Sequence, residues 1–124
     1  MSKILILGFH TINLILIIFY LYPGSLVGFF LYSDSSIQPQ ITRDFLISSN
    51  HFYVFIILSI SGIIAYNKTT RINVLITYLF LLSIIIEFFH IIIPNRNFEL
   101  NDLFGNFLGV VLIITFYKIK NRYV

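Results

Sequence analysis

The stretch INVLITYLFLLSIIIEFFHIII, residues 72–93, decides the structural class of this protein. It contains one charged residue, Glu87, and it is followed by Pro94, a residue that interrupts helices. About 20 consecutive apolar residues in a helix are long enough to cross the hydrocarbon core of a bilayer. The stretch therefore predicts a transmembrane helix.

The rest of the chain has the same character. Of its 124 residues, 58% are hydrophobic and 10% are charged, whereas soluble domains carry about 25% charged residues. The first apolar run is long for a signal peptide and lacks a small-x-small cleavage site, so we interpret it as an uncleaved span. We predict one all-α membrane domain, residues 1–124, built as a bundle of four transmembrane helices. The predicted spans are residues 4–22, 48–66, 72–93 and 103–117.

Positive charges predict the orientation, because cytoplasmic loops of membrane proteins are enriched in Lys and Arg. If the amino terminus is cytoplasmic, only Arg43 and Arg96 of the eight Lys and Arg residues lie outside. Both termini are therefore predicted to be cytoplasmic. The net charge of +3 is too small and too scattered to indicate a nucleic-acid partner. All acidic residues then belong to the outer half: Asp34, Asp44, Glu87, Glu99 and Asp102.

Glu87 is the most unusual residue of the predicted third span. A charged side chain deep in a span costs at least about 2.5–3.5 kcal/mol, so it faces protein or water rather than lipid. Ser83, Glu87, His90 and Pro94 are spaced by four, three and four residues, which places them on one helical face. We expect this face to point into the bundle.

A second polar face is predicted on the fourth span, where Asp102, Asn106 and Gly109 are separated by four and three residues. Asp102 is also a good candidate for a helix N-cap. Gly105 and Gly109 form a GxxxG pair, which favours close helix packing. The predicted polar site combines both faces with His51 and with Arg96, which could pair with Glu87 or Asp102 or bind an anionic lipid phosphate. Its members are His51, Glu87, His90, Arg96, Asp102 and Asn106.

Other chemistries find less support. Glu-x-x-His pairs occur in di-metal bundles, but those need the pair twice with further glutamates, and this chain has only Glu87 and His90. There is no cysteine, so thiolate ligands are excluded, and no metal or cofactor is predicted. No nucleophile elbow, phosphate loop or HExxH is present, so no catalytic residue is assigned. For His10 and Asn13 in the first span, interhelical hydrogen bonds are favoured over a proton relay.

The polar residues, taken in order, resemble the VanZ-like family of bacterial membrane proteins. The resemblance covers roughly residues 45–117 and is carried by three motifs: His51-Phe52, the stretch EFFHIIIPNR at 87–96, and the stretch DLFGNFLG at 102–109. Two departures stand out. Residues 47–50 read ISSN, where family members commonly have an Asp-Lys pair, and His90 replaces a common glutamine. The resemblance implies a multi-pass protein of the bacterial cytoplasmic (inner) membrane, linked to the cell envelope and to resistance to teicoplanin-type glycopeptides.

These observations favour a non-enzymatic protein that binds a membrane lipid or a lipid-linked envelope precursor at its outer polar cluster. In that reading Arg96 holds a phosphate, while Glu87 and Asp102 accept donors or orient Arg96. One alternative is an intramembrane enzyme with Glu87 or His51 as general base on a lipid-linked substrate. Another is a structural membrane component whose polar residues satisfy one another. No oligomeric state is predicted.

Overall fold

The computed structural model describes residues 2–124, and this part of the chain contains helices but no strand. Four of the helices, with a short extension of α4, are long and apolar enough to cross a membrane, which confirms an all-helical protein with four long apolar helices. The elements are α1 (Ser2–Leu21), α2 (Leu26–Tyr32), α3 (Ser49–Tyr66), α4 (Ile72–Phe88), the 3₁₀ turn η1 (Phe89–Ile91) and α5 (Leu100–Tyr123).

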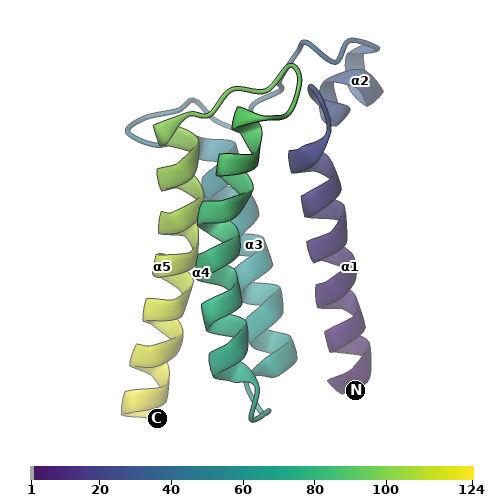
Figure 1. Cartoon of the computed structure of the whole chain (residues 1–124). Helices are drawn as coiled ribbons and strands as arrows, with labels where there is room; N and C mark the ends of the chain where they lie inside the picture. The colour runs from purple at the N-terminus through teal and green to yellow at the C-terminus, as the bar shows by residue number, and fades with distance from the viewer. Residues whose placement is uncertain (1) are drawn as a thin grey trace.

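The long helices run alternately up and down, so both chain termini lie at one end of the bundle (Figure 1). We call this the termini end. At the other end, the loop end, lie α2, residues 33–48 and the hairpin of residues 92–99 between η1 and α5. Helix α3 is central: it packs most extensively against α5 and also contacts α1 and α4. Helix α1 packs mainly against α3 and has only a small contact with α4.

The third and fourth long helices differ in their boundaries from the sequence prediction. The third predicted span was expected to reach residue 93, but α4 ends at Phe88 and tightens into η1 up to Ile91. Pro94 explains why the helix does not continue to residue 93, because it disfavours the α conformation in the residue before it. The fourth span was expected at residues 103–117, whereas α5 runs from Leu100 to Tyr123. Its extra turns include Lys120 and Arg122, cations that are favourable at a helix carboxyl terminus.

Most of the helical surface is apolar and exposed. In the most apolar 18-residue window of each long helix, only 17–33% of the residues are buried inside the structure. Large side chains such as Ile4, Leu7, Leu81 and Phe116 point outward. Helices that are apolar on all sides are typical of a membrane environment, and exposed apolar surface of this extent is rare in soluble monomers.

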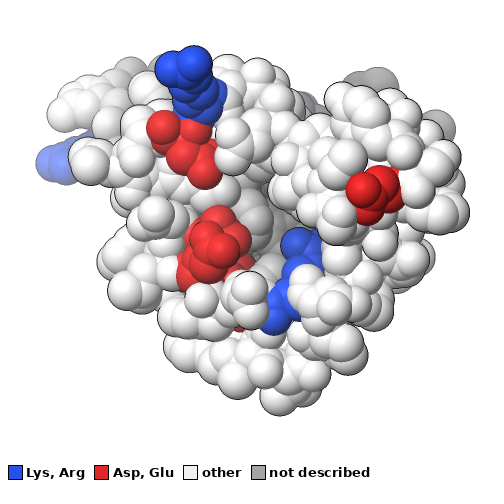
Figure 2. Space-filling model, turned by 90° about the horizontal axis from the view of Figure 1, so that it is seen from above, with Lys and Arg blue, Asp and Glu red and all other residues white. Residues whose placement is uncertain are grey.

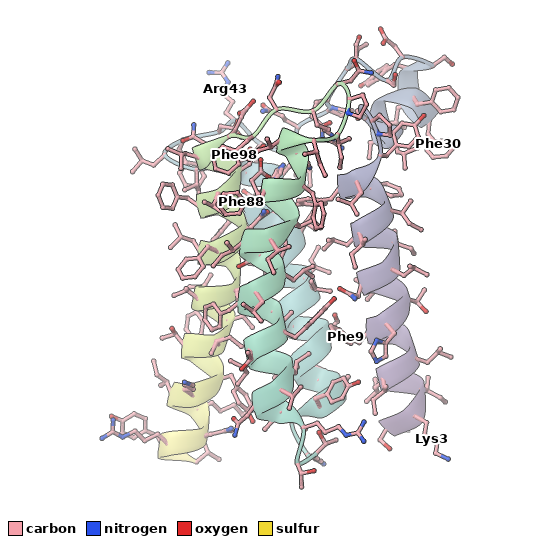
Figure 3. All side chains as sticks on the ribbon, in the orientation of Figure 1. Lys3, Phe9, Phe30, Arg43, Phe88 and Phe98 are labelled. Carbon is pink, nitrogen blue, oxygen red and sulfur yellow. The ribbon has the colours of Figure 1, made fainter. Side chains whose placement is uncertain are left out.

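The core changes character along the bundle axis. Toward the termini end it is apolar: Leu75 and Leu79 of α4 are buried with Ala65 of α3, and Phe9 of α1 points toward its neighbours (Figure 3) and meets the Tyr66 ring edge-on at 5.8 Å. Toward the loop end the buried side chains are mostly polar, and this half of the core holds the candidate site. They are Ser48, Ser49, Ser83, Glu87, His90 and Asn106.

Two glycines set the distance between α3 and α5. A Cβ atom added to Gly105 would lie 2.7 Å from the carbonyl oxygen of Ser48, and one added to Gly109 would lie 2.7 Å from that of Phe52. Such contacts are too short for any side chain, so the glycines allow the two backbones to approach closely. The Ser48 N–H also donates to the Asn101 carbonyl across this interface at 3.1 Å. The polar ends of α3 and α5 are thereby brought together.

Candidate functional site

The structure gathers five of the six predicted site residues in the loop-end core. His51 lies in the first turn of α3, Glu87 near the end of α4, and His90 in η1. Asp102 and Asn106 lie in the first two turns of α5. The side chains of Glu87, His90 and Asn106 are almost completely buried. Seen from the loop end, only a few charged side chains stand out on a mostly uncharged surface (Figure 2).

Glu87 and His90 form a buried pair. His90 Nδ1 lies 3.1 Å from Glu87 Oε1, and its Nε2 lies 2.9 Å from the carbonyl oxygen of Tyr20. A carbonyl oxygen can only accept, so Nε2 carries a hydrogen and donates to it. The contact between Nδ1 and Oε1 then needs one further proton, held by the imidazole or by the carboxyl group. Glu87 Oε1 also accepts the Glu99 N–H at 3.1 Å, which ties α4 to the start of α5.

Asn106 connects the second histidine to α1. Its Oδ1 accepts the Tyr20 hydroxyl at 3.0 Å and lies 3.0 Å from His51 Nδ1. Because the amide oxygen is an acceptor, His51 Nδ1 is the donor of this bond, and Nε2 keeps its lone pair. The Tyr20 ring meets His51 edge-on at 4.9 Å and stacks over His90 at 6.2 Å. Tyr20 therefore belongs to the site, although it was not among the residues predicted from the sequence.

Asp102 does not cap its helix. The N-cap of α5 is Glu99, which makes no side-chain capping bond, and Asp102 lies in the first helical turn. Its Oδ2 instead lies 3.4 Å from His51 Nε2. An acidic side chain is favoured in a first turn by the helix dipole. Here that position also directs the carboxylate toward α3.

Of the two roles predicted for Arg96, the ion pair with Glu87 or Asp102 is not formed. Arg96 makes no ion pair within 4.0 Å with any described carboxylate. Its Nε donates to the Tyr22 carbonyl at 3.1 Å and its Nη2 donates to the Phe19 carbonyl at 2.9 Å. Phe19 lies in the last turn of α1, where helical oxygens lack partners within the helix, and Tyr22 directly follows the helix. Arg96 therefore clamps the hairpin of residues 92–99 to α1.

The electrostatics of Arg96 agree with a half-buried clamp. Burial lowers the pKa of Arg96 below its ordinary value, while the nearby Glu87 and Asp102 act in the opposite direction. Arginine nevertheless stays protonated under all ordinary conditions. The guanidinium also lines a cavity described below, so its remaining N–H groups are available to an anion there.

Arg96→Lys should loosen the end of α1, because an ammonium group cannot span two carbonyls as a guanidinium fork does. Losing about 1 kcal/mol of hydrogen bonding corresponds to about fivefold faster amide hydrogen exchange through local opening. We expect this acceleration in residues 18–22, measured by hydrogen–deuterium exchange in detergent. The matched control is Arg43→Lys, an exposed arginine at the same end of the bundle (Figure 3). Equal exchange rates in the two variants would contradict the clamp.

The polar pair of α1 lies apart from this site. His10 Nε2 is 2.9 Å from the Tyr66 hydroxyl of α3, and Asn13 Nδ2 donates to the Tyr78 hydroxyl of α4 at 2.6 Å. These are interhelical hydrogen bonds, the interpretation that the sequence favoured. They hold the termini half of α1 against its neighbours.

A cavity of about 530 Å³ opens beside the polar core, between α1, α2 and α3. Its wall is mostly apolar, with Ile12, Ile15 and Phe19 from α1 facing Val54 and Ile57 from α3. His51 and Arg96 line it as well. A cavity of this size is within the usual range for small-ligand sites, which combine apolar walls with a few polar groups.

The segment of residues 38–41 also contributes to the cavity wall, and Asn50 holds it in place. Asn50 Nδ2 donates to the Pro39 carbonyl at 2.7 Å, and Asn50 Oδ1 accepts the Ile41 N–H at 3.0 Å. Asp44 accepts the Ser49 N–H at 2.9 Å, so it provides the helix-capping bond that Ser48 does not. The wall is therefore anchored to the first turn of α3, next to His51.

Comparisons with known proteins found no relative of this chain. No protein-family model, no curated protein and no solved structure matches the chain.

Proposed function

We propose that this chain is a multi-pass protein of the bacterial cytoplasmic membrane that binds an envelope lipid or a lipid-linked headgroup. Both termini would lie in the cytoplasm. The distribution of charge supports this orientation, because Lys3, Lys68, Arg71 and three cations of the carboxyl-terminal segment belong to the termini end. Cations are enriched on the cytoplasmic side of membrane proteins. The loop end would then face the outer side.

The observation that carries the proposal is the two-part chemistry of the 530 Å³ cavity. Apolar side chains of α1 and α3 suit a hydrocarbon chain, whereas Arg96 and His51 lie where a headgroup would be held. Arg96 uses its Nε and Nη2 on carbonyls, which leaves its Nη1 donors for a phosphate or carboxylate oxygen. Charge-assisted bonds of this kind are among the stronger ones in proteins.

The motif order of residues 51–109 supports a narrower proposal. Its resemblance to the VanZ-like family favours an envelope lipid or lipid-linked precursor as the ligand and a contribution to teicoplanin-type resistance. In that setting the bound headgroup would be presented at the outer surface of the membrane, where such precursors are used.

Ile57→Trp is the direct test of the lipid site. Ile57 lines the cavity and is 58% exposed, so a larger ring fills the cavity without entering the core. The matched control is Ile64→Trp, seven residues later on the same face of α3 and 51% exposed, but outside the cavity lining. We expect native mass spectrometry to show at least about tenfold less co-purified lipid for Ile57→Trp only, consistent with the loss of about 1.4 kcal/mol. Unchanged lipid occupancy in a folded Ile57→Trp protein would refute the proposal.

An intramembrane enzyme acting on a lipid-linked substrate is the second candidate. It is favoured by one observation: Glu87 Oε2 is buried and has no hydrogen-bond partner among the described residues, so a basic carboxylate oxygen is held ready beside His51. The lipid extracts of the same experiment separate the two candidates. A lipid product that accumulates with the protein and disappears in Glu87→Gln indicates an enzyme, whereas stoichiometric unmodified lipid indicates a binding protein.

A further inference from the structure

Three side chains from three different helices converge in the loop-end core. His51 of α3, Glu87 of α4 and Asp102 of α5 each offer one ligand atom, and these atoms lie within 4.8 Å of one another. One imidazole nitrogen and two carboxylate oxygens are a ligand set that suits divalent transition metals such as zinc and manganese. The chain brings them together only through its tertiary fold, since the three residues are far apart in sequence.

Glu87 supplies an independent reason to expect a ligand here. Its side chain is fully buried, and its Oε2 has no hydrogen-bond partner among the described residues. This oxygen faces His51, with 4.0 Å between Oε2 and Nδ1. A buried carboxylate oxygen without a partner is costly, and such an atom in a folded protein calls for an explanation. A bound cation would satisfy it.

The hydrogen bonds around the three residues are those expected of metal ligands. His51 donates through Nδ1 to Asn106 Oδ1, so its Nε2 lone pair points toward Asp102 Oδ2 at 3.4 Å. Two electron-rich atoms then face each other. A ligating histidine usually donates its other ring N–H to an acceptor, and a ligating carboxylate is usually held through its second oxygen. Glu87 meets the second condition, because its Oε1 is held by the Glu99 N–H.

A proton shared by His51 Nε2 and Asp102 Oδ2 would remove the repulsion between their lone pairs. It would still leave Glu87 Oε2 without a hydrogen-bond partner. A cation among the three groups satisfies all of them at once. His90 is not a ligand in this arrangement, since both of its ring nitrogens are already engaged. The histidine with a free lone pair beside Glu87 is His51, which lies on another helix and which the Glu87-x-x-His90 spacing does not reveal.

We propose that His51, Glu87 and Asp102 form a mononuclear binding site for a divalent transition metal, with zinc as the reference ion. Ligand atoms around one zinc ion lie about 2.0–2.2 Å from it, so the three side chains close by small rotations on binding. Three protein ligands leave a coordination position for an oxygen from water or an anionic group. Because His51 also lines the 530 Å³ cavity, that position lies beside the cavity's polar end. The site does not depend on lipid binding.

The test uses the full chain in detergent, stripped of metal with a chelator and then loaded with Zn²⁺ or Co²⁺. We expect about one zinc ion per chain by elemental analysis after desalting, and visible absorption bands of cobalt held by nitrogen and oxygen ligands. His51→Gln and Asp102→Asn should weaken zinc binding by at least about tenfold and abolish the cobalt bands. The matched controls are His10→Gln and Asp34→Asn, a histidine at the termini end and an exposed carboxylate at the loop end. Both should bind as the unmodified chain does.

The unmodified chain decides the question even if a ligand variant fails to fold. Failure to retain zinc, together with an absence of cobalt bands, overturns the proposal. So does equal weakening in the ligand variants and in the controls. The lipid measurement on Ile57→Trp is separate, because that side chain is not among the ligands. If Ile57→Trp keeps its lipid while the unmodified chain takes up zinc, the result counts against the proposed function alone. If Ile57→Trp loses its lipid while the unmodified chain takes up no zinc, the result counts against the metal site alone.

Discussion

Replacing Glu87 with alanine is expected to destabilise the fold by about 1–3 kcal/mol, the usual cost of leaving a buried polar group without its hydrogen-bond partner. His90 would keep its bond to the Tyr20 carbonyl but lose the acceptor or donor at Nδ1. The Glu99 N–H would lose its acceptor as well. The Glu87 carboxyl group joins three elements, α4, η1 and the start of α5. Its removal is therefore expected to loosen the packing of the whole loop-end core.

The measurement is the midpoint of thermal or denaturant unfolding in a defined detergent. His10→Ala is the control, because His10 is exposed and makes one hydrogen bond at the other end of the bundle. Glu87→Gln should cost less than Glu87→Ala, since the amide oxygen can still accept the Glu99 N–H. If Glu87→Ala proved no more destabilising than His10→Ala, the pair would not support the fold in the way described here.

The second large effect is expected at the interface of α3 and α5. Gly109→Ala places a methyl group 2.7 Å from the Phe52 carbonyl oxygen and 3.0 Å from the Phe55 Cβ, so the helices must separate. Overpacking a close interface costs about 1–3 kcal/mol. Phe55 is fully buried and cannot yield without disturbing its own neighbours. The expected result is a lower unfolding midpoint in the same detergent assay.

Gly8→Ala is the matched control for this experiment. Gly8 is an exposed glycine in the interior of α1, and a Cβ atom there meets nothing within 4 Å. Alanine is favoured over glycine inside a helix by about 1 kcal/mol in water, so Gly8→Ala should leave stability unchanged or raise it slightly. Gly105→Ala should behave like Gly109→Ala, because its Cβ would meet the Ser48 carbonyl. Equal stability of the three variants would mean that α3 and α5 are not in close contact.

The sequence was most informative for features that depend on a single helix, namely the apolar runs that form the long helices and the spacing of polar residues along them. Long apolar runs indicated four long helices, and the stretch before Pro94 forms one of them, a continuous helical element of 20 residues from Ile72 to Ile91. Helical spacing placed Glu87 and His90 on one inward face, and both are buried. It also placed Asp102 and Asn106 together, one and two turns into α5. Each inference needed only the geometry of a single helix.

The inferences that failed needed the position of another helix. For Arg96 the sequence left open an ion pair with Glu87 or Asp102 and the binding of a lipid phosphate. The structure shows no such ion pair, and the partners of Arg96 are backbone oxygens of Phe19 and Tyr22, which are not distinguished by residue type. Tyr20 contributes a hydroxyl to Asn106 and a carbonyl to His90, and no pattern within its own helix marks it as a partner of these residues. The sequence did predict that His51, Glu87 and Asp102 share one polar site, and the structure brings them together. Their exact distances depend on how α3 approaches α5, which two glycines control.

The Arg96 clamp has a consequence for the order of events during synthesis. Helix α1 is made first, yet its main packing partner, α3, is made later, and the arginine that engages its last carbonyls follows α4. Helix α1 therefore lacks its hydrogen bonds from Arg96 until more than half of the chain has been translated. Domains of growing chains generally fold as their parts emerge. In this chain α1, the earliest of the four long helices in the sequence, is therefore among the last to complete its contacts.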